Sequence, residues 1–345
     1  MMPLTATEFG IMLTIRRRQQ TSGERDAMGI AVGTGLATYP FSSVDGFWRW
    51  IALCEDGGID SIWQTDTLVS REPMLECMSA LAAMAGATKR LKFGMNVASV
   101  GIRDPLLLAK QCATIDVLSQ GRMLPAFGIG NPRSADWRAS GAAVKGRGRR
   151  TDEGLDVIAA LWRGEEITMD GEFYQYDRVR ISPTPVQQPL PLWIGGSSEA
   201  AIRRTVRIGT GWQAAAESPE QAAETVSKIL DGCREAGRHM DPEHFGIGIN
   251  FRFGSYEDEP VKQAIERFER VLNRSGRHTF AAGDAGEILG KVRAYVDAGI
   301  SKFVLRPLAT GDEDVLQQTQ RLVDEILPEI ARWNQERKAA KKKTA

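Results

Sequence analysis

Residues 191–202 (PLWIGGSSEAAI) hold a strand, a turn and the start of a helix. Leu192–Ile194 is a short apolar run, Gly195 and Gly196 allow a tight turn, and Ser198 is a favoured N-cap for the helix that follows. The glycines also let a ligand approach the backbone, and a helix N-terminus offers unpaired N–H groups at the positive end of its dipole. The stretch predicts either a phosphate-binding turn or a plain capped strand–helix connection.

The same order of strand and helix recurs along the chain. Helices are expected, for example, from Pro73 to Ala87 and from Thr151 to Trp162, and two helical patterns lie between the last two strands. We predict eight strands, at residues 29–33, 59–64, 91–97, 123–129, 192–194, 211–214, 245–251 and 303–305. This alternation is typical of a parallel sheet with helices outside it. We therefore predict an α/β fold, a single (β/α)8 TIM barrel with its functional groups just after the strands.

Three stretches do not follow this alternation. Residues 1–27 contain three consecutive arginines and a polar stretch, so Met28 is a candidate for the true start of the protein. Residues 163–191 are rich in Pro, Gly and aromatic side chains, and we predict that they form an inserted segment of the barrel. Residues 334–345 contain few apolar side chains, which predicts a disordered basic tail. The expected barrel therefore spans residues 28–333.

The composition is that of an ordinary folded protein. The 345 residues include 44 basic and 44 acidic side chains, so no net charge attracts the chain to nucleic acid or anionic lipid. No run approaches the roughly 18 apolar residues that a membrane-spanning helix needs. The N-terminal arginines follow an apolar stretch, the reverse of a secretory signal. We expect a cytoplasmic protein that binds neither nucleic acid nor membrane.

Cysteine and histidine are sparse and scattered. Cys54, Cys77, Cys112 and Cys233 lack redox or metal-binding spacing and lie in helical patterns, which predicts small, reduced, buried side chains. The three histidines fall at no predicted strand end. The sequence therefore predicts no metal site, no Ser-His-Asp triad and no glycosidase carboxylate pair. A barrel so poor in acid–base groups suggests that a cofactor supplies the reactivity.

Several side chains mark the mouth of the predicted barrel. Trp63 and Asp66 leave the second strand, and they either line a pocket or serve as a core residue and a turn residue. Arg306 directly follows the last strand, where it meets either an anion or a carboxylate of a neighbouring loop. Gly130 and Asn131 follow the fourth strand. Only the start of a dinucleotide-binding fingerprint is present there, and a tight turn explains these residues better.

A basic cluster follows in the glycine-rich stretch after the fourth strand. Guanidinium groups bind oxyanions, so the cluster either clamps an anionic ligand or closes over the pocket as a lid. A solvated basic loop is the more common alternative. The cluster comprises Lys145, Arg147, Arg149 and Arg150.

Five motifs follow one another along the predicted barrel. They are residues 118–122 (LSQGR), 162–164 (WRG), 171–174 (GEFY), 183–187 (PTPVQ) and 191–198 (PLWIGGSS). Together they resemble the bacterial luciferase-like monooxygenase superfamily, which contains luciferases, alkanesulfonate monooxygenases and deazaflavin-dependent oxidoreductases. The resemblance runs from about Met28 to Trp333, and it implies a (β/α)8 barrel with an inserted segment and a flavin-type cofactor across the carboxyl ends of the strands.

The resemblance also implies which segments contact the cofactor. Its phosphate is expected at the turn of residues 195–198, residues 96–99 match the stretch that abuts the isoalloxazine ring in relatives, and residues 130–131 match a loop that contacts the cofactor. With one arginine of the basic cluster, the candidate cofactor-binding residues are Asn96, Val97, Ala98, Gly130, Asn131, Arg150, Gly195, Gly196, Ser197 and Ser198.

The chain departs from these relatives at two proton-transfer positions. Luciferases carry an acidic residue and a histidine after the second strand, where this chain has Asp66 and Thr67. Alkanesulfonate monooxygenases carry a histidine in the seventh strand, where Asn250 aligns. Both substitutions remove a group that transfers protons near neutral pH, so the general base stays open. The candidate catalytic residues are Asp66, Trp63, Asn250 and Arg306.

The resemblance favours one reaction and leaves others open. Most members of the superfamily take reduced flavin from a separate reductase and use it with dioxygen to oxygenate a substrate. We therefore hypothesise a monooxygenase that uses reduced FMN on a small organic substrate, and that forms a homodimer as many relatives do. The alternatives are hydride transfer with a deazaflavin coenzyme, a flavin-binding protein without catalysis, and a Rossmann-type dehydrogenase that binds NAD at Gly33–Gly35.

Overall fold

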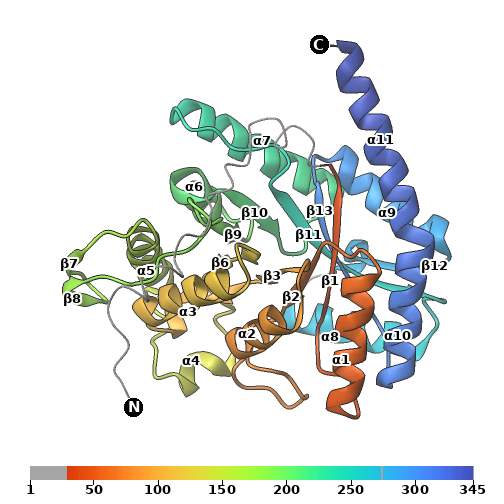
Figure 1. Cartoon of the computed structure of the whole chain (residues 1–345), viewed down its shortest axis with the longest axis horizontal. Coiled ribbons are helices and arrows are strands. Elements are labelled where there is room, and N and C mark those ends of the chain that lie inside the picture. Colours follow the sequence, from red (N-terminus) through yellow and green to blue (C-terminus); the bar gives the residue numbers. More distant parts are fainter. Residues whose placement is uncertain (1–28, 273–274, 345) are drawn as a thin grey trace, which may run out of the picture.

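The computed structural model describes residues 29–272 and 275–344 of the chain. Its strands curl around a common axis and its helices cover their outer side (Figure 1). None of the described helices combines the length and the apolar character needed to cross a lipid bilayer. The expected N-terminal extension, residues 1–27, lies outside the described residues.

The main sheet consists of parallel strands only. Every pairing within it is parallel, as expected where each strand is followed by a helix that returns along the outside. Its strands are β1 (Ala31–Leu36), β2 (Ser61–Gln64), β3 (Lys92–Met95), β4 (Ala98–Ser99), β5 (Met123–Leu124), β6 (Ala126–Gly128), β9 (Trp193–Gly195), β10 (Gly211–Ala214), β11 (Phe245–Phe253), β12 (Phe280–Gly283) and β13 (Lys302–Pro307).

These strands close into a ring. β3 and β4 are two parts of one strand interrupted at Asn96 and Val97, and β5 and β6 are parts of another interrupted at Pro125. Pairing then runs from β1 through β2, β3/β4, β5/β6, β9, β10, β11 and β13 back to β1. This arrangement confirms the predicted (β/α)8 fold. β12, which the sequence analysis missed, pairs with the end of β11 as an additional strand.

The helices begin where the sequence offers capping side chains. Ser43, Asp104, Ser198, Ser218 and Asp284 each accept a hydrogen bond from a first-turn N–H group. The helices are α1 (Val44–Asp56), α2 (Cys77–Ala87), α3 (Pro105–Leu118), α4 (Ala135–Ala139), α5 (Arg147–Trp162), α6 (Glu199–Ile208), α7 (Pro219–Glu235), α8 (Glu259–Leu272), α9 (Ala285–Asp297), α10 (Gly311–Arg321) and α11 (Leu327–Thr344), with the 3-10 turns η2 (Val100–Ile102) and η3 (Arg277–Thr279) and the π-helical turn η4 (Leu322–Ile326).

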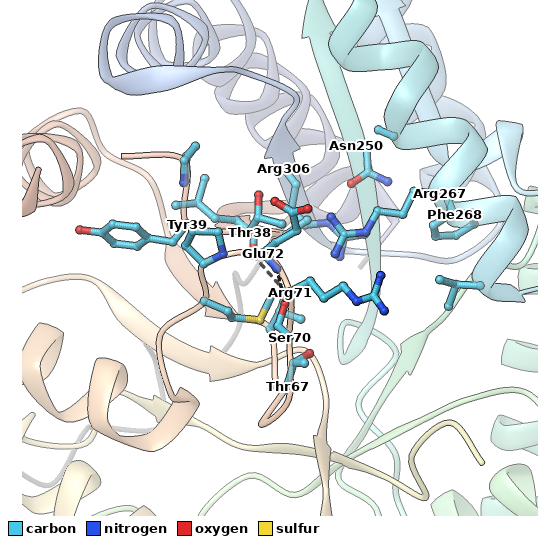
Figure 2. A pocket seen from close by; sticks show the side chains of 18 of the residues that line it. Thr38, Tyr39, Thr67, Ser70, Arg71, Glu72, Asn250, Arg267, Phe268 and Arg306 are labelled. Atoms are coloured by element: carbon cyan, nitrogen blue, oxygen red, sulfur yellow. Dashed lines mark hydrogen bonds between the residues drawn. The ribbon is translucent and has the colours of Figure 1, made fainter. Parts of the chain in front are cut away.

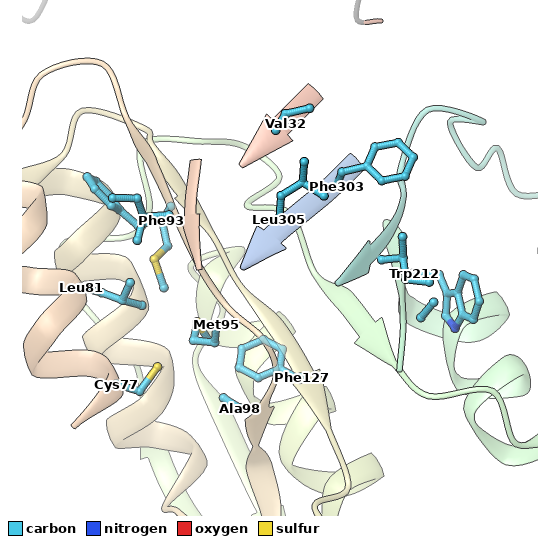
Figure 3. Packing of buried hydrophobic residues seen from close by; sticks show 14 of the residues in the cluster. Val32, Cys77, Leu81, Phe93, Met95, Ala98, Phe127, Trp212, Phe303 and Leu305 are labelled. Atoms are coloured by element: carbon cyan, nitrogen blue, oxygen red, sulfur yellow. The ribbon is translucent and has the colours of Figure 1, made fainter. Parts of the chain in front are cut away.

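The core fills the space between the sheet and the helices. Figure 3 shows Leu81 of α2 near Phe93 of β3, with Cys77 one turn earlier on the same helix, and all three side chains are buried. A separate cluster inside the barrel contains Trp63, Ala126, Trp193 and Val304. Cys54, Cys77, Cys112 and Cys233 lie in helices as free, buried thiols, which confirms their predicted structural role.

Two helices begin elsewhere than predicted. α2 starts at Cys77 instead of Pro73, because the Glu76 carboxylate accepts hydrogen bonds from the N–H groups of Met78 and Ser79 and fixes the first turn there. α5 starts four residues before the predicted Thr151, after Gly146 in a left-handed conformation (φ 79°).

The inserted segment contains a small sheet of its own. β7 (Ile167–Asp170) pairs antiparallel with β8 (Gln175–Val179). The Glu153 carboxylate of α5 accepts hydrogen bonds from the N–H groups of Glu172, Phe173 and Tyr174, at 3.0, 3.0 and 2.7 Å. The hairpin is therefore attached to α5 through its turn.

The predicted disordered tail was wrong for the described residues. α11 continues through this segment to Thr344. Its Asn334 side chain accepts a hydrogen bond from the Ile30 N–H at 2.7 Å and donates one to the Ile30 carbonyl at 2.8 Å. A low apolar content misled the prediction, because this turn of the helix is held by hydrogen bonds to the chain just before β1.

Candidate functional site

A cavity of about 1340 Å³ opens at the carboxyl ends of the strands (Figure 2). Its walls come from the segments that follow β1, β2, β6 and β13, and from α8. Side chains that follow different strands meet there because the parallel strands all end on one side of the barrel. The cavity therefore lies where the fold class predicts a functional site.

The cavity brings together four residues that the sequence analysis singled out: Asp66, Asn131, Asn250 and Arg306. Asn250 and Arg306 are partners in the register of β11 and β13. Trp63 does not line the cavity. It is only 4% exposed, and its indole N–H donates to Ser61 Oγ at 2.9 Å inside the barrel. Of the two roles that the sequence allowed for Trp63, the structure places it in the core.

Asp66 is held in a buried ion pair. Its carboxylate accepts hydrogen bonds from Arg103 Nη2 at 2.5 Å, from Arg103 Nη1 at 2.7 Å and from the Ser99 N–H at 2.9 Å. Burial disfavours the charge of Arg103, but the Asp66 and Glu76 carboxylates outweigh it and raise the pKa of Arg103. Both Asp66 oxygens are engaged, so this geometry suits a residue that positions the segment after β4 and not one that transfers protons.

Arg306 lies at the end of β13 with its guanidinium turned into the barrel mouth. Its Nε atom is buried without a hydrogen-bond partner, and burial lowers the pKa of the side chain to about 10. The lack of a side chain at Gly248 leaves room for the Arg306 guanidinium, since a Cβ atom at Gly248 would lie 2.7 Å from Arg306 Nη2 and 3.5 Å from Asn96 Nδ2. The guanidinium and the Asn96 amide are thus neighbours, and the cavity contains a cation that attracts an anion or another acceptor.

The residues expected at a flavin ring form the wall beside this cavity. A cis peptide bond joins Asn96 and Val97. The Val97 side chain lies against two glycines, because Cβ atoms at Gly128 and Gly195 would lie only 2.8 and 2.9 Å from Val97 Cγ2. Ser99 lines the cavity directly. The segment of residues 96–99 therefore separates the cavity from the glycine turn.

The glycine turn of residues 195–198 leads into α6 as predicted. Gly196 adopts a φ of 99°, a conformation that favours glycine. Ser198 accepts a hydrogen bond from the Ala201 N–H at 3.2 Å, whereas the Ser197 hydroxyl donates to the buried Glu217 carboxylate. Ser198 and the first N–H groups of α6 are consequently better placed than the Ser197 hydroxyl to hold an anion.

Three of the four members of the basic cluster are helical, and Lys145 lies in the turn just before the helix. Arg147, Arg149 and Arg150 form the first turn of α5, which stays beside α6 through the Arg204–Asp152 ion pair at 2.6 Å. The Arg150 guanidinium lies 4.8 Å from the centre of the Phe173 ring.

Two observations fit a phosphate-bearing cofactor. The Nε atoms of Arg147 and Arg150 are buried without partners, and Arg204 of α6 joins the N-terminal part of α5 through Asp152 at 2.6 Å and the Gly148 carbonyl at 3.4 Å. The residues present are therefore compatible with a flavin or deazaflavin phosphate between the two helices.

The sequence analysis missed several charged residues of this region. Arg103 lies four residues beyond the stretch predicted to contact the ring, and Glu217 lies three residues after a predicted strand end, so a wider window at each strand end would have included both. Arg71 and Arg267 line the cavity from the β2–α2 loop and α8, without any local motif. Over residues 29–272 and 275–344, no group of three or more His, Cys, Asp and Glu side chains is arranged to hold a metal ion.

Comparison with known proteins identifies the family. The sequence profile of the luciferase-like monooxygenases matches residues 7–272. The chain belongs to the luciferase-like monooxygenase family. This membership confirms the resemblance seen in the sequence motifs, and it makes the chain a member of an oxidoreductase family.

Two curated relatives of this luciferase-like chain differ in coverage. An uncharacterized protein of Mycobacterium tuberculosis is 31% identical over 168 residues, which are 48% of this chain and 57% of that protein. The match thus spans little more than half of that relative. The F420-dependent glucose-6-phosphate dehydrogenase of Amycolatopsis mediterranei is 26% identical over 315 residues, covering 82% of this chain and 93% of that enzyme.

Solved structures of luciferase-like proteins have the same fold. The monooxygenase RslO1 from Streptomyces bottropensis superposes with a TM-score of 0.76 at 20% identity, covering 87% of this chain and 99% of that protein. An F420-dependent secondary alcohol dehydrogenase gives a TM-score of 0.74 at 19% identity, with 87% and 98% coverage. At these identities the likeness establishes the barrel alone.

Proposed function

We propose that this luciferase-like chain is a coenzyme-dependent oxidoreductase acting on a small organic substrate in the 1340 Å³ cavity. The observation that carries the proposal is the wall of residues 96–99, because it adjoins the cavity through Ser99 and the glycine turn through Val97. A reduced flavin or deazaflavin bound along that wall supplies the hydride or the reducing electrons. The protein supplies the binding site and the orientation.

The residues have distinct proposed roles. Ser198 and the N-termini of α5 and α6, with Arg150, hold the phosphate of the coenzyme. Val97 supports the ring, and the Asp66–Arg103 pair fixes the segment that carries Val97, through the Ser99 N–H. Arg306 and Asn250 face the substrate from the ends of β13 and β11. No described histidine lines the cavity, so we assign no residue to proton transfer there.

We place the deazaflavin coenzyme F420 first and reduced FMN second. The relative from Amycolatopsis mediterranei is F420-dependent by name, and its match covers 82% of this chain. This supports hydride transfer without oxygen. Most members of the superfamily that the sequence motifs resemble use reduced flavin with dioxygen, and this supports the second candidate. In that case dioxygen is the second substrate and a separate reductase supplies the reduced FMN.

Titration of the purified protein with each coenzyme, oxidised and reduced, tests the proposal. We expect one of the two to bind, with quenching of its fluorescence, and single-turnover spectra without and with air to distinguish hydride transfer from oxygenation. Gly195→Ala should weaken this binding because the new methyl group displaces Val97. Gly86→Ala is the matched control, since a Cβ there meets nothing within 4 Å. The proposal fails if neither coenzyme binds the wild-type protein.

A further inference from the structure

Arg306 has no anionic partner among the residues that the structure describes. Of the three carboxylates that line the cavity, Asp66 is engaged by Arg103, and Asp136 accepts the Val69 N–H at 2.8 Å. Glu72 lies on the exposed β2–α2 loop. Burying the Arg306 Nε atom without a partner is costly in free energy, and proteins retain such groups where a ligand completes them.

More cations surround the same cavity. Arg71 reaches into it from the β2–α2 loop, and Arg267 does so from α8 on the opposite wall (Figure 2). Arg133 and Arg270 also line it. The lining thus contains five arginines against three carboxylates, one of which is already neutralised by Arg103. The lining residues therefore carry a net positive formal charge, although the whole chain has no net charge.

One wall of the cavity is apolar. Phe268 of α8 and Phe280 of β12 both line it, and their rings meet edge to face with centroids 5.4 Å apart. Leu308 lies in the same buried cluster as Phe280. This wall is suited to a hydrocarbon or aromatic surface and offers little to a strongly hydrated sugar.

We propose that the substrate of this site is an organic anion with an apolar body, whose carboxylate or phosphate is bound by the Arg306 guanidinium while its body packs against Phe268 and Phe280. A planar guanidinium binds either oxyanion through two parallel N–H···O bonds. Arg71 and Arg267 attract the anion at the entrance and raise its rate of association. This inference rests on the proposed function, which places the substrate in this cavity.

Calorimetric titration of the coenzyme-free protein provides the test. The probes are acid and amide pairs of the same shape: phenylacetate with phenylacetamide, 4-phenylbutyrate with 4-phenylbutyramide, and decanoate with decanamide, with phenyl phosphate as the phosphate case. We expect at least one acid to bind about tenfold or more tightly than its amide, and Arg306→Gln to abolish that preference. Arg234→Gln, on the outer helix α7, is the control and should preserve it. Circular dichroism and thermal melting confirm that both variants fold.

Three results would overturn the inference. They are equal affinity for acid and amide in every pair, no measurable binding of any acid at about 10 mM, and loss of coenzyme affinity in Arg306→Gln with an unchanged acid preference. The last result would assign Arg306 to the coenzyme. Failure of the wild-type protein to bind either coenzyme refutes the proposed function instead, and it leaves the acid preference to be read independently.

Discussion

At the scale of single residues, the structure separates side chains that the sequence presents alike. Trp63, Asp66 and Arg306 all lie at predicted strand ends. Trp63 packs inside the barrel, Asp66 is bound by Arg103, and only Arg306 keeps unused donors. The sequence could predict that these residues lie near the mouth, because strand ends determine it. Which of them already has a partner depends on residues far away in the chain.

Arg306 should reduce the stability of the ligand-free protein. Its pKa of about 10 lies below that of a solvated arginine, so its charged form disfavours the folded state at neutral pH. We expect Arg306→Met to raise the free energy of unfolding by roughly 1–3 kcal/mol at pH 7. The difference in the free energy of unfolding between variant and wild type should shrink as the pH rises through about 10, because the wild-type Arg306 side chain then loses its proton on folding.

Urea unfolding of both proteins between neutral and alkaline pH checks this expectation. A variant less stable than the wild type at pH 7 would show that Arg306 has a stabilising partner in the ligand-free protein. Arg234→Met is a suitable control, since Arg234 is exposed on α7 and pairs only with Asp231 at the surface. Its effect should stay below about 1 kcal/mol.

Asp66 should contribute mainly to stability and site geometry. Asp66→Asn leaves the Arg103 guanidinium, 12% exposed, with only the more distant Glu76 carboxylate at 3.7 Å, and we expect a loss of about 3–5 kcal/mol in urea unfolding. The double variant Asp66→Asn/Arg103→Met should recover much of this loss, because no buried charge then lacks a partner. Glu313→Gln breaks the exposed pair with Arg49 and is the control. A stable but inactive Asp66→Asn protein would instead support a proton-transfer role.

At the scale of elements, local capping side chains determine where helices begin, whereas contacts across the barrel determine where a strand is interrupted. Ser198 and Asp284 begin their helices as the sequence indicates. The break between β3 and β4 carries no local signal, yet it places Val97 against the glycines of β6 and β9. β12 also escaped prediction, because its short run Phe280–Gly283 is recognisable as a strand only beside β11.

The link between α11 and the start of the barrel gives a prediction at this scale. Asn334→Ala removes both hydrogen bonds to Ile30, and we expect the free energy of unfolding to fall by about 1–3 kcal/mol. Gln335→Ala, at the neighbouring exposed position, should change it by less than about 0.5 kcal/mol. Thermal and urea unfolding compare the two variants. Equal stabilities would show that the two Asn334 hydrogen bonds contribute nothing to holding the first strand.

At the scale of the whole molecule, packing protects the thiols. Burial raises the pKa values of Cys54, Cys77, Cys112 and Cys233. The thiolate is the reactive form, so we expect no thiol to react with a disulfide reagent such as DTNB in the native protein at pH 8. All four should react in denaturant. Rapid reaction of any one of them without unfolding would contradict the packing of its helix.

The sequence by itself determined the alternation of strands and helices, the capped glycine turn of residues 195–198 and membership of the luciferase-like family. These depend on neighbours within a few residues, where spacing and capping chemistry act directly. Only the tertiary structure decided which side chains meet. Closure of the barrel brings Asp66 to Arg103, Val97 to Gly195 and Arg306 over Gly248, and it leaves the buried Arg306 Nε atom without a described partner. Which side chains meet depends on burial and on contacts between distant segments, and neither can be derived from short-range spacing in the sequence.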